Sequence, residues 1–190
     1  MNVFEGYRIT SPYGWRIDPI NGSKAFHTGI DLVKAHRAPI QAFVPGEVLH
    51  AGMGISGTGF GGYGNVVAIR DKNGKLHCYC HLDSVTVSVG QYVQKGQVVG
   101  LQGSTGRSTG SHLHYEVRSK CEPHFGWKSH IDPVAYLEEY FAKEEEVMFE
   151  ELKRQFEQLA AENKRLQQRV ETLEKLQSMP EIPEWAQEAM

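Results

Sequence analysis

The sequence contains few cysteines and no long apolar run, and each absence excludes a class of protein. Its three cysteines are an odd number without the spacing of a disulfide framework, so we expect them to be reduced packing residues. No stretch is long and apolar enough to span a membrane. Residues 1–16 lack the basic segment and apolar run of a secretory signal peptide, so delivery by another route is expected if the substrate is extracellular.

A strong excess of one charge is also missing, and the glycines are unevenly placed. The formal net charge is -3, which gives no electrostatic reason to expect nucleic-acid binding. Residues 1–140 carry 13 Lys and Arg against 11 Asp and Glu, whereas residues 141–190 carry 7 against 12. All 20 glycines lie at or before Gly126. The chain therefore divides into a glycine-rich first part and a helix-rich second part.

Short segments of β-forming residues follow one another in the first part, with turn residues between them. Asp71 to Gly74 is a hairpin signal between two of these segments. The close spacing predicts a mainly β fold built on a compact antiparallel sheet. The expected strands are Ile40 to Val44, Glu47 to Ala51, Asn65 to Arg70, Leu76 to His81, Thr86 to Val89, Gln97 to Gln102 and His112 to Arg118.

The first motif with metal-ligand chemistry is HTGID, from His27 to Asp31. It is a poor helix because Gly29 lies between β-branched Thr28 and Ile30. In a straight strand, His27 and Asp31 would lie about 13 Å apart at about 3.3 Å per residue, too far for ligands of one metal. The segment must therefore bend, and Gly29 permits the bend.

The second motif, HLHYE from His112 to Glu116, is typical of a strand. Alternation places His112, His114 and Glu116 on one face, so both imidazoles point to the same place. The segment YCHL adds His81. A lone buried histidine is more often a satisfied core residue than a ligand, but these motifs together favour one zinc site with its proton-handling groups. The spacing does not distinguish His112 from His114 as a ligand.

Two loops are rich in glycine. Gly52 to Gly64 holds seven glycines, and Gly103 to Gly110 leads directly into HLHYE. Neither loop follows the phosphate-binding Walker pattern or opens a helix. Low steric bulk beside a metal site suits a groove that admits an extended polymer, although a flexible connection is a fair alternative for the first loop.

Several of these segments together resemble one family. The motifs TSPYGWRIDP, HTGIDL, GYGNVVAI, YCHL and STGRSTGSHLHYEVR, in this order, are similar to those of the lysostaphin-type (LytM-like) zinc endopeptidases that cut peptidoglycan. The resemblance covers roughly residues 4–140, and several motifs in order are far more specific than one. It implies a compact antiparallel β fold with a long groove, one Zn2+ per chain and a peptidoglycan peptide as substrate.

The resemblance also implies roles for individual residues. His27, Asp31 and His114 become the zinc ligands, and His81 and His112 become the catalytic pair. Three protein ligands leave an open position for water, as a catalytic zinc requires. One imidazole of the pair would take the water's proton, and the imidazoles would return a proton to the leaving amine.

Four neighbouring residues receive weaker assignments. Glu116 shares the strand face of the two motif histidines, and we expect it to orient a neighbour or to be structural. Tyr63 and Asn65 fall in a segment that matches the family, and packing is the favoured role for both. Cys80 precedes the catalytic His81 at a position where a smaller residue such as Ala or Gly is expected.

A different pattern follows Asp132 and Pro133, which suit the cap and the first turn of a helix. Apolar residues then repeat by heptad on a charged helix, which is typical of a coiled coil. Asn163 at an a position favours a parallel dimer in fixed register, and Arg169 would pair with Glu174 of the other chain. The alternative is a long amphipathic helix folded back on the β domain. Positions a are Phe149, Phe156, Asn163, Val170 and Gln177, and positions d are Leu152, Leu159, Leu166 and Leu173.

We therefore expect an endopeptidase domain over 1–140, a coiled-coil helix over 141–178 and a proline-containing tail over 179–190, in which Trp185 is a candidate docking residue. The expected function is hydrolysis of peptide bonds in peptidoglycan cross-links by a homodimer joined through the coil. Two other functions stay open, a non-catalytic LytM-like activator of wall hydrolases and a scaffold in which zinc is structural.

The expected place of action is the bacterial cell wall. The absence of a signal peptide favours a phage-encoded lysin, released by the host or carried on the virion, or else a piece of a longer secreted or anchored protein. The residues do not determine whether the bond cleaved lies in a glycine bridge or next to D-Ala.

Overall fold

The computed structural model describes residues 3–178, so the tail expected over 179–190 and its Trp185 lie outside the described residues. The chain divides into two compact units. The first unit ends at Tyr140, and the second begins at Phe141. Each unit is described below by itself.

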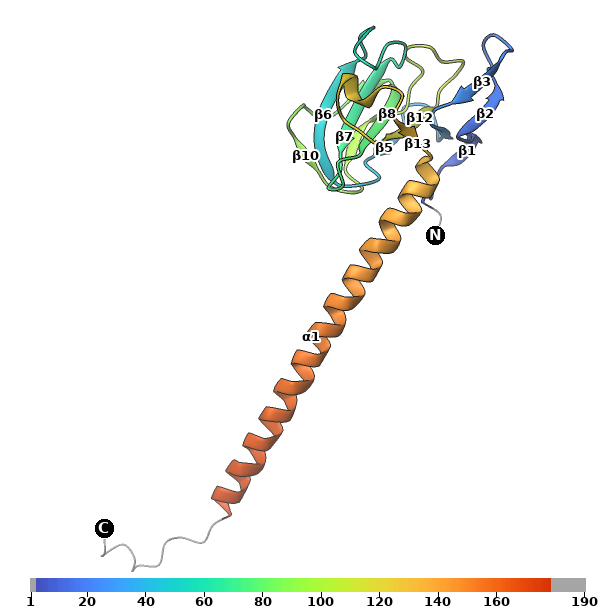
Figure 1. The fold of residues 1–190 in the computed structure, drawn as a ribbon. Helices are drawn as coiled ribbons and strands as arrows, with labels where there is room; N and C mark the ends of the chain where they lie inside the picture. Colours follow the sequence, from blue (N-terminus) through green and yellow to red (C-terminus); the bar gives the residue numbers. More distant parts are fainter. Residues whose placement is uncertain (1–2, 179–190) are drawn as a thin grey trace, which may run out of the picture. The chain divides into compact units, whose positions relative to one another are not determined.

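Antiparallel strands form most of the first unit (Figure 1). The main sheet has the order β1-β4-β12-β8-β7-β6-β10, with β13 paired to β12, and two smaller sheets are β5-β11-β9 and β2-β3. The prediction of a mainly β fold with an antiparallel sheet is therefore confirmed. The strands are β1 (Arg8–Ser11), β2 (Gly14–Ile17), β3 (Lys24–His27), β4 (Ile30–Val33), β5 (Pro39–Gln41), β6 (Gly46–Met53), β7 (Asn65–Arg70), β8 (Leu76–Leu82), β9 (Ser84–Val85), β10 (Tyr92–Val93), β11 (Val98–Leu101), β12 (Leu113–Arg118) and β13 (His130–Ile131), and a 3-10 turn spans His124–Gly126.

The two central strands, β8 and β12, are buried along their whole length. Alternation along β12 sends Leu113, Tyr115 and Val117 to one face. The other face carries His114 and Glu116, which are polar and nevertheless buried. Because buried polar groups must be hydrogen-bonded, partners for both side chains are expected on this face of β12.

The hairpin expected at Asp71 to Gly74 joins β7 to β8. The Asp71 amide donates to the Lys75 carbonyl at 2.9 Å, which closes the turn. Gly74 has φ 72°, in the left-handed region that glycine adopts without steric cost. The turn prediction is confirmed.

Some strand predictions need correction. The strand expected over Thr86 to Val89 is wrong, because β9 covers only Ser84–Val85 and the chain then turns through Gly90 at φ 85°. The strand expected from Ile40 ends at Gln41. Strands β1 to β3 were not predicted, because turn-forming residues interrupt the weak alternation of that segment. Their sheet pairing, which the sequence does not display, stabilises them.

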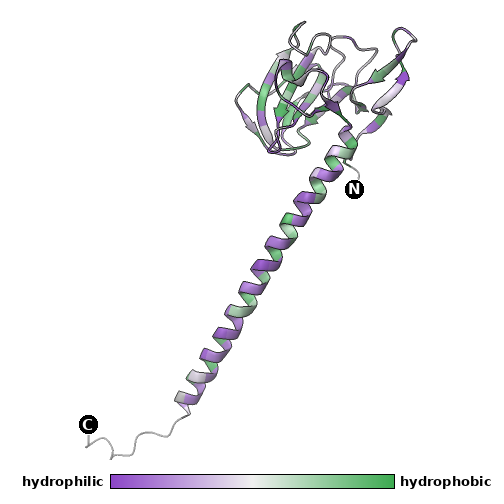
Figure 2. Cartoon of the chain, viewed as in Figure 1, coloured by the Kyte–Doolittle hydropathy of each residue, from purple (hydrophilic) through white to green (hydrophobic). Residues whose placement is uncertain are grey.

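Helix α1, Pro133–Gln177, is one continuous helix of 45 residues. It begins after Asp132, whose Oδ1 accepts a hydrogen bond from the Val134 amide at 2.9 Å, as the predicted cap requires. From Ala142 to Lys175 the side chains are exposed. Figure 2 shows apolar positions recurring among the polar residues of this helix. Within residues 3–178, no helix is both long and apolar enough to cross a membrane.

The three cysteines form no disulfide, as expected. Cys78 and Cys80 are buried, and Cys121 is half-buried. Burial raises the pKa of the Cys78 thiol to about 12, so this sulfur stays protonated and unreactive. Both buried cysteines belong to an apolar cluster that also contains Phe60 and Val66.

Candidate metal centre

The HTGID segment bends where the sequence predicts. Strand β3 ends at His27 and β4 begins at Ile30, so Thr28 and Gly29 form the bend. Space is the reason for glycine here: a Cβ on Gly29 would lie 2.4 Å from the carbonyl oxygen of Tyr115. The bend and the close approach to β12 together bring the two motifs side by side.

Three donor atoms meet at this point. His27 Nε2 lies 3.0 Å from His114 Nδ1 and 3.1 Å from Asp31 Oδ1, and the last two atoms lie 3.0 Å apart. Ligands of a tetrahedral zinc, each about 2.0–2.1 Å from the metal, are about 3.3 Å from one another. All three residues are buried. These three metal-donor atoms, of His27, Asp31 and His114, are called the donor triangle below. The donor triangle fits one face of a zinc coordination sphere and leaves the fourth position open.

Neighbouring acceptors fix which ring nitrogen is free to bind a metal. His27 Nδ1 donates to the Pro12 carbonyl at 2.8 Å, which leaves the Nε2 lone pair for the metal. His114 Nε2 donates to Glu116 Oε1 at 3.1 Å, which leaves Nδ1. Carboxylate or carbonyl acceptors behind ligating histidines hold the ring and its tautomer.

Glu116 is the hub behind His114. It is 1% exposed and also accepts hydrogen bonds from Tyr63 Oη at 2.9 Å, from Thr28 Oγ1 and from Arg118 Nε at 2.8 Å. Burial raises the pKa of Glu116, but the His114 hydrogen bond and the Arg118 charge outweigh it and hold the pKa well below its usual range. Glu116 is thus a carboxylate that orients His114, in agreement with its predicted role.

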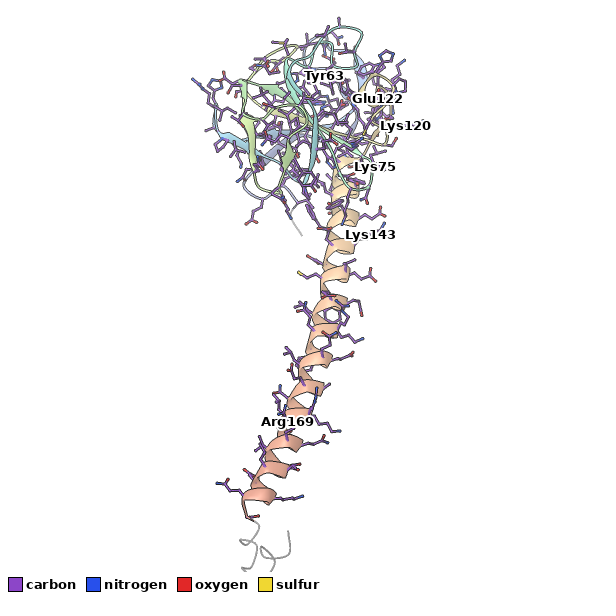
Figure 3. All side chains as sticks on the ribbon, turned by 90° about the vertical axis from the view of Figure 1, so that its left-hand side faces the viewer. Tyr63, Lys75, Lys120, Glu122, Lys143 and Arg169 are labelled. Carbon is purple, nitrogen blue, oxygen red and sulfur yellow. The ribbon has the colours of Figure 1, made fainter. Side chains whose placement is uncertain are left out.

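Tyr63 does more than the packing role predicted for it. It lies in the β unit (Figure 3), donates to Glu116 and lines the same pocket as the metal ligands. Asn65 fits the packing prediction better, because its side-chain amide donates to the carbonyls of Leu82 and Asp83, each at 3.1 Å. Arg118, which the sequence did not single out, lies with its guanidinium 5.5 Å from the Tyr63 ring.

Asp31 has a partner that the sequence did not reveal. Arg16 Nη1 donates to Asp31 Oδ2 at 2.8 Å and to Ser11 Oγ at 2.5 Å. The second carboxylate oxygen of Asp31 is thereby occupied, and Oδ1 is left facing the two histidines. The signal available was the position of Arg16 in a segment that resembles the family.

His81 and His112 form a second pair in the same pocket, with ring centroids 4.9 Å apart. His81 Nδ1 donates to the Thr105 carbonyl and His112 Nδ1 to the Gly110 carbonyl, each at 2.8 Å. Both residues therefore have Nε2 free to accept a proton. His112 Nε2 lies 3.6 Å from Asp31 Oδ1, which places it beside the donor triangle.

The environment of His81 suits a base rather than a cation. Burial lowers the pKa of His81 to about 4, with His114 adding to the effect. Its backbone has φ 62°, a left-handed conformation that costs a non-glycine residue about 1–3 kcal/mol. The His81 amide bonded to the Tyr63 carbonyl at 2.9 Å helps to hold that conformation.

The glycine-rich loops form walls of the pocket. Gly62 and Tyr63 come from the first loop, and Arg107 comes from the second. The Arg107 amide donates to the Gly62 carbonyl at 2.8 Å, and a Cβ on Gly106 would lie 2.3 Å from the Gly64 nitrogen. The two loops are packed against each other, so the alternative of a purely flexible first loop does not describe them.

Comparison with protein families identifies the fold and the site together. The model of Peptidase family M23 matches residues 25–125, which is more than half of the chain and contains all five pocket residues named above as ligands or bases. The chain belongs to peptidase family M23. The donor triangle is thus the metal site of an M23 domain.

Individual relatives support the assignment of the M23 domain. The DD-carboxypeptidase/endopeptidase Mpg of Neisseria meningitidis is 43% identical over 116 residues, which are 61% of this chain and 25% of Mpg. The chain therefore spans about a quarter of the length of that relative. The catalytic domain of lysostaphin from Staphylococcus simulans superposes with a TM-score of 0.59 at 32% identity, covering 70% of this chain and 92% of that domain.

A third comparison concerns a protein of viral origin. The catalytic domain of the prophage-encoded M23 protein EnpA from Enterococcus faecalis superposes with a TM-score of 0.56 at 34% identity. The superposed region covers 68% of this chain and 90% of the EnpA domain. The solved domains of lysostaphin and EnpA are both similar to the M23 domain of this chain.

Proposed function

We propose that this chain is a zinc-dependent endopeptidase that hydrolyses peptide bonds in bacterial peptidoglycan cross-links. The observation that carries the proposal is the donor triangle of His27, Asp31 and His114, which opens on the same pocket as His81 and His112. A metal with one open position beside two free imidazole nitrogens is an arrangement for hydrolysis. Peptidoglycan as substrate is supported by the similarity to the peptidoglycan DD-endopeptidase ShyA of Vibrio cholerae, which is 32% identical over 162 residues.

The residues divide the proposed reaction between binding and proton transfer. Zinc held by the triangle supplies Lewis-acid activation of water and of the scissile carbonyl. The free Nε2 of His81 or His112 accepts the proton of the attacking water. The imidazoles then deliver a proton to the leaving amine, so the proton taken from water ends on the new amino terminus.

The intact site argues against the two alternative functions. A non-catalytic activator does not need the two bases, yet His81 and His112 are both held with Nε2 free. A structural zinc has four protein ligands, whereas the group found within residues 3–178 has three. We therefore favour the enzyme over the activator and the scaffold.

The deciding experiment is digestion of purified peptidoglycans of different cross-bridge chemistry, followed by mass spectrometry. New peptide amino termini that disappear when a chelator is present are the expected result, and their sequence names the bond. If no wall type is cut by zinc-loaded protein, the endopeptidase proposal is wrong.

We further propose that α1 forms a parallel homodimer. The heptad residues Phe156, Leu159 and Leu166 are at least 48% exposed, so the apolar stripe of the second unit is uncovered. A second copy suits the stripe because Arg169, labelled in Figure 3, and Glu174 occupy positions that pair between parallel chains.

We also propose that the protein acts at the bacterial cell wall. Family membership supports that location, since the relatives named above include lysostaphin. The similarity to EnpA is consistent with a phage origin, which stays a prediction.

A further inference from the structure

One ion pair crosses the pocket that contains the metal site. Arg107 Nη2 lies 2.9 Å from Asp18 Oδ2, although the residues are 89 apart in the sequence. Arg107 belongs to the glycine-rich loop between β11 and β12, and Asp18 belongs to the connection between β2 and β3. Both side chains line the pocket together with the catalytic pair. The ion pair therefore links two walls of the pocket close to the chemistry.

The backbones on both sides are held independently of this ion pair. Asp18 Oδ1 accepts hydrogen bonds from the amides of Ile20 at 2.8 Å and Asn21 at 3.3 Å, which fix the turn. The Arg107 amide is bonded to Gly62. The Arg107 side chain is 55% exposed, and an ion pair this exposed contributes little to stability. The guanidinium can therefore leave Asp18 while both loops keep their places.

The charges of the pocket single out Arg107. The other guanidinium in its lining, that of Arg16, is bound to the metal ligand Asp31 and to Ser11. The Arg107 guanidinium is held only by Asp18, through one nitrogen, among the contacts described for residues 3–178. A guanidinium carries five N–H donors in a planar fork that matches a carboxylate with two parallel hydrogen bonds. Arg107 thus has donors to spare for a second anion.

We infer that Arg107 binds a free carboxylate of the peptide substrate and that Asp18 holds the guanidinium in position until the substrate displaces it. The substrates favoured are stem peptides with an unmodified carboxylate next to the cleavage site, and amidated peptides are disfavoured. Arg107 is a specificity-determining residue in this view, because it touches the substrate away from the reacting atoms. The inference rests on the proposed function.

The test compares two synthetic stem peptides that end in D-Ala-D-Ala and differ only in a free carboxylate or a carboxamide at the carboxyl terminus. Binding is measured by isothermal titration calorimetry with the zinc-loaded full chain carrying His81→Ala, so that hydrolysis does not obscure binding. We expect the carboxylate peptide to bind about tenfold more tightly, as one charge-assisted contact supplies. When the His81→Ala protein also carries Arg107→Gln, the preference for the carboxylate peptide should disappear.

Two further variants sharpen the result. Asp18→Asn keeps an oxygen for the turn amides but removes the competing charge, so the carboxylate peptide should bind severalfold more tightly. Arg37→Gln is the matched control, because Arg37 forms an exposed ion pair with Asp83 at 3.2 Å and does not line the pocket. It should leave the preference unchanged.

Equal binding of the two peptides, absence of binding of both, or a preference that survives Arg107→Gln would overturn the inference. Failure of the proposed function is a separate result. It would appear as a wild-type chain that discriminates between the peptides by binding but releases no chelator-sensitive fragments from any wall.

Discussion

At the scale of single residues, hydrogen-bond acceptors decide which ring nitrogen of each pocket histidine is free. In each ring one nitrogen is occupied by a protein acceptor and the other faces the pocket. The position of the free nitrogen then separates ligands from bases, because His27 Nε2 and His114 Nδ1 lie 3.1 Å and 3.0 Å from Asp31 Oδ1, whereas His112 Nε2 lies 3.6 Å from it. The acceptors are the carbonyls of Pro12, Thr105 and Gly110 and the carboxylate of Glu116, for His27, His81, His112 and His114 respectively.

Two histidine variants test that separation. His114→Ala should lose zinc and activity together, because it removes one of three ligands. His112→Ala should keep near-stoichiometric zinc and lose at least about 100-fold in turnover, the usual contribution of a general acid or base. Zinc content by atomic emission and kcat on a wall peptide are the measurements. An empty metal site in His112→Ala would mean that the ligand assignment is wrong.

A second prediction concerns the space beside the ligands. Gly29→Ala should cost about 1–3 kcal/mol in the free energy of unfolding, because the added Cβ would lie 2.4 Å from the Tyr115 carbonyl oxygen. Zinc affinity should fall as well, since the same atom would lie 2.9 Å from His114 Cε1. Urea unfolding and competition with a chromogenic chelator measure the two effects.

The matched control is Gly110→Ala, where a Cβ meets nothing within 4 Å. It should leave the free energy of unfolding within about 0.5 kcal/mol of the parent. If both alanine variants are equally stable, the close approach of Gly29 to β12 is not needed for the fold.

At the scale of elements, the first turn of α1 is joined to the β7–β8 hairpin by a buried polar cluster. Tyr136 Oη donates to Asp71 Oδ2, and His77 Nε2 donates to the same oxygen at 3.2 Å. Tyr115 Oη donates to His77 Nδ1 at 2.7 Å. His77 is fully buried, and burial lowers its pKa although Asp71 opposes the effect. The ring is therefore neutral and both of its nitrogens are used.

This cluster predicts a loss of stability in acid. The pKa of His77 is lowered in the folded protein, so below about pH 6.5 the unfolded chain binds the proton more readily and the free energy of unfolding falls. The lowered pKa of Asp71, where hydrogen bonds from His77 and Tyr136 outweigh burial, adds a loss below about pH 4. Each group contributes at most about 1.4 kcal/mol per pH unit.

Urea unfolding between pH 7.5 and pH 5 measures the effect of His77 on the free energy of unfolding. His77→Gln should reduce the pH dependence relative to the parent protein, whatever it does to stability at pH 7.5. His36→Gln, at an exposed position, should leave that dependence unchanged. A parent and a His77 variant with the same pH dependence would contradict the prediction.

The elements also differ in how far the sequence predicts them. Strands β7, β8 and β12 were predicted to within about one residue because β-forming residues lie between clear turn signals. Strands β1 to β3 were not, because they contain or adjoin turn residues and depend on pairing with distant partners. Helix α1 was predicted over its full described length, since its N-terminal cap and its heptads are local signals.

At the scale of the whole molecule, the proposed dimer would carry two M23 domains on one coil. The helix of 45 residues is about 68 Å long at about 1.5 Å per residue. Two domains on one scaffold meet a polymeric substrate with a higher effective concentration than two separate ones. The coil would thus contribute to the proposed activity without touching the bond that is cut.

Asn163→Val tests the dimer. Removing the polar a position should strengthen helix association, seen as a higher melting temperature by circular dichroism, while the number of chains in the complex becomes less uniform. Light scattering with size-exclusion chromatography measures the number of chains in the complex. Unchanged dimers in the variant would show that Asn163 does not set the oligomeric state, and a monomeric parent protein would refute the proposed dimer.

The sequence by itself determined the antiparallel β class, the long helix and the set of residues from which the metal site is built. Those features depend on local periodicity, turn residues and short motifs, which can be recognised within a few residues. Only the tertiary structure decided the donor atom of each histidine, the roles of Tyr63 and Arg118 behind Glu116, and the ion pair of Arg107 with Asp18. These depend on distances between segments up to 89 residues apart, which are set by strand pairing and loop packing rather than by any local pattern.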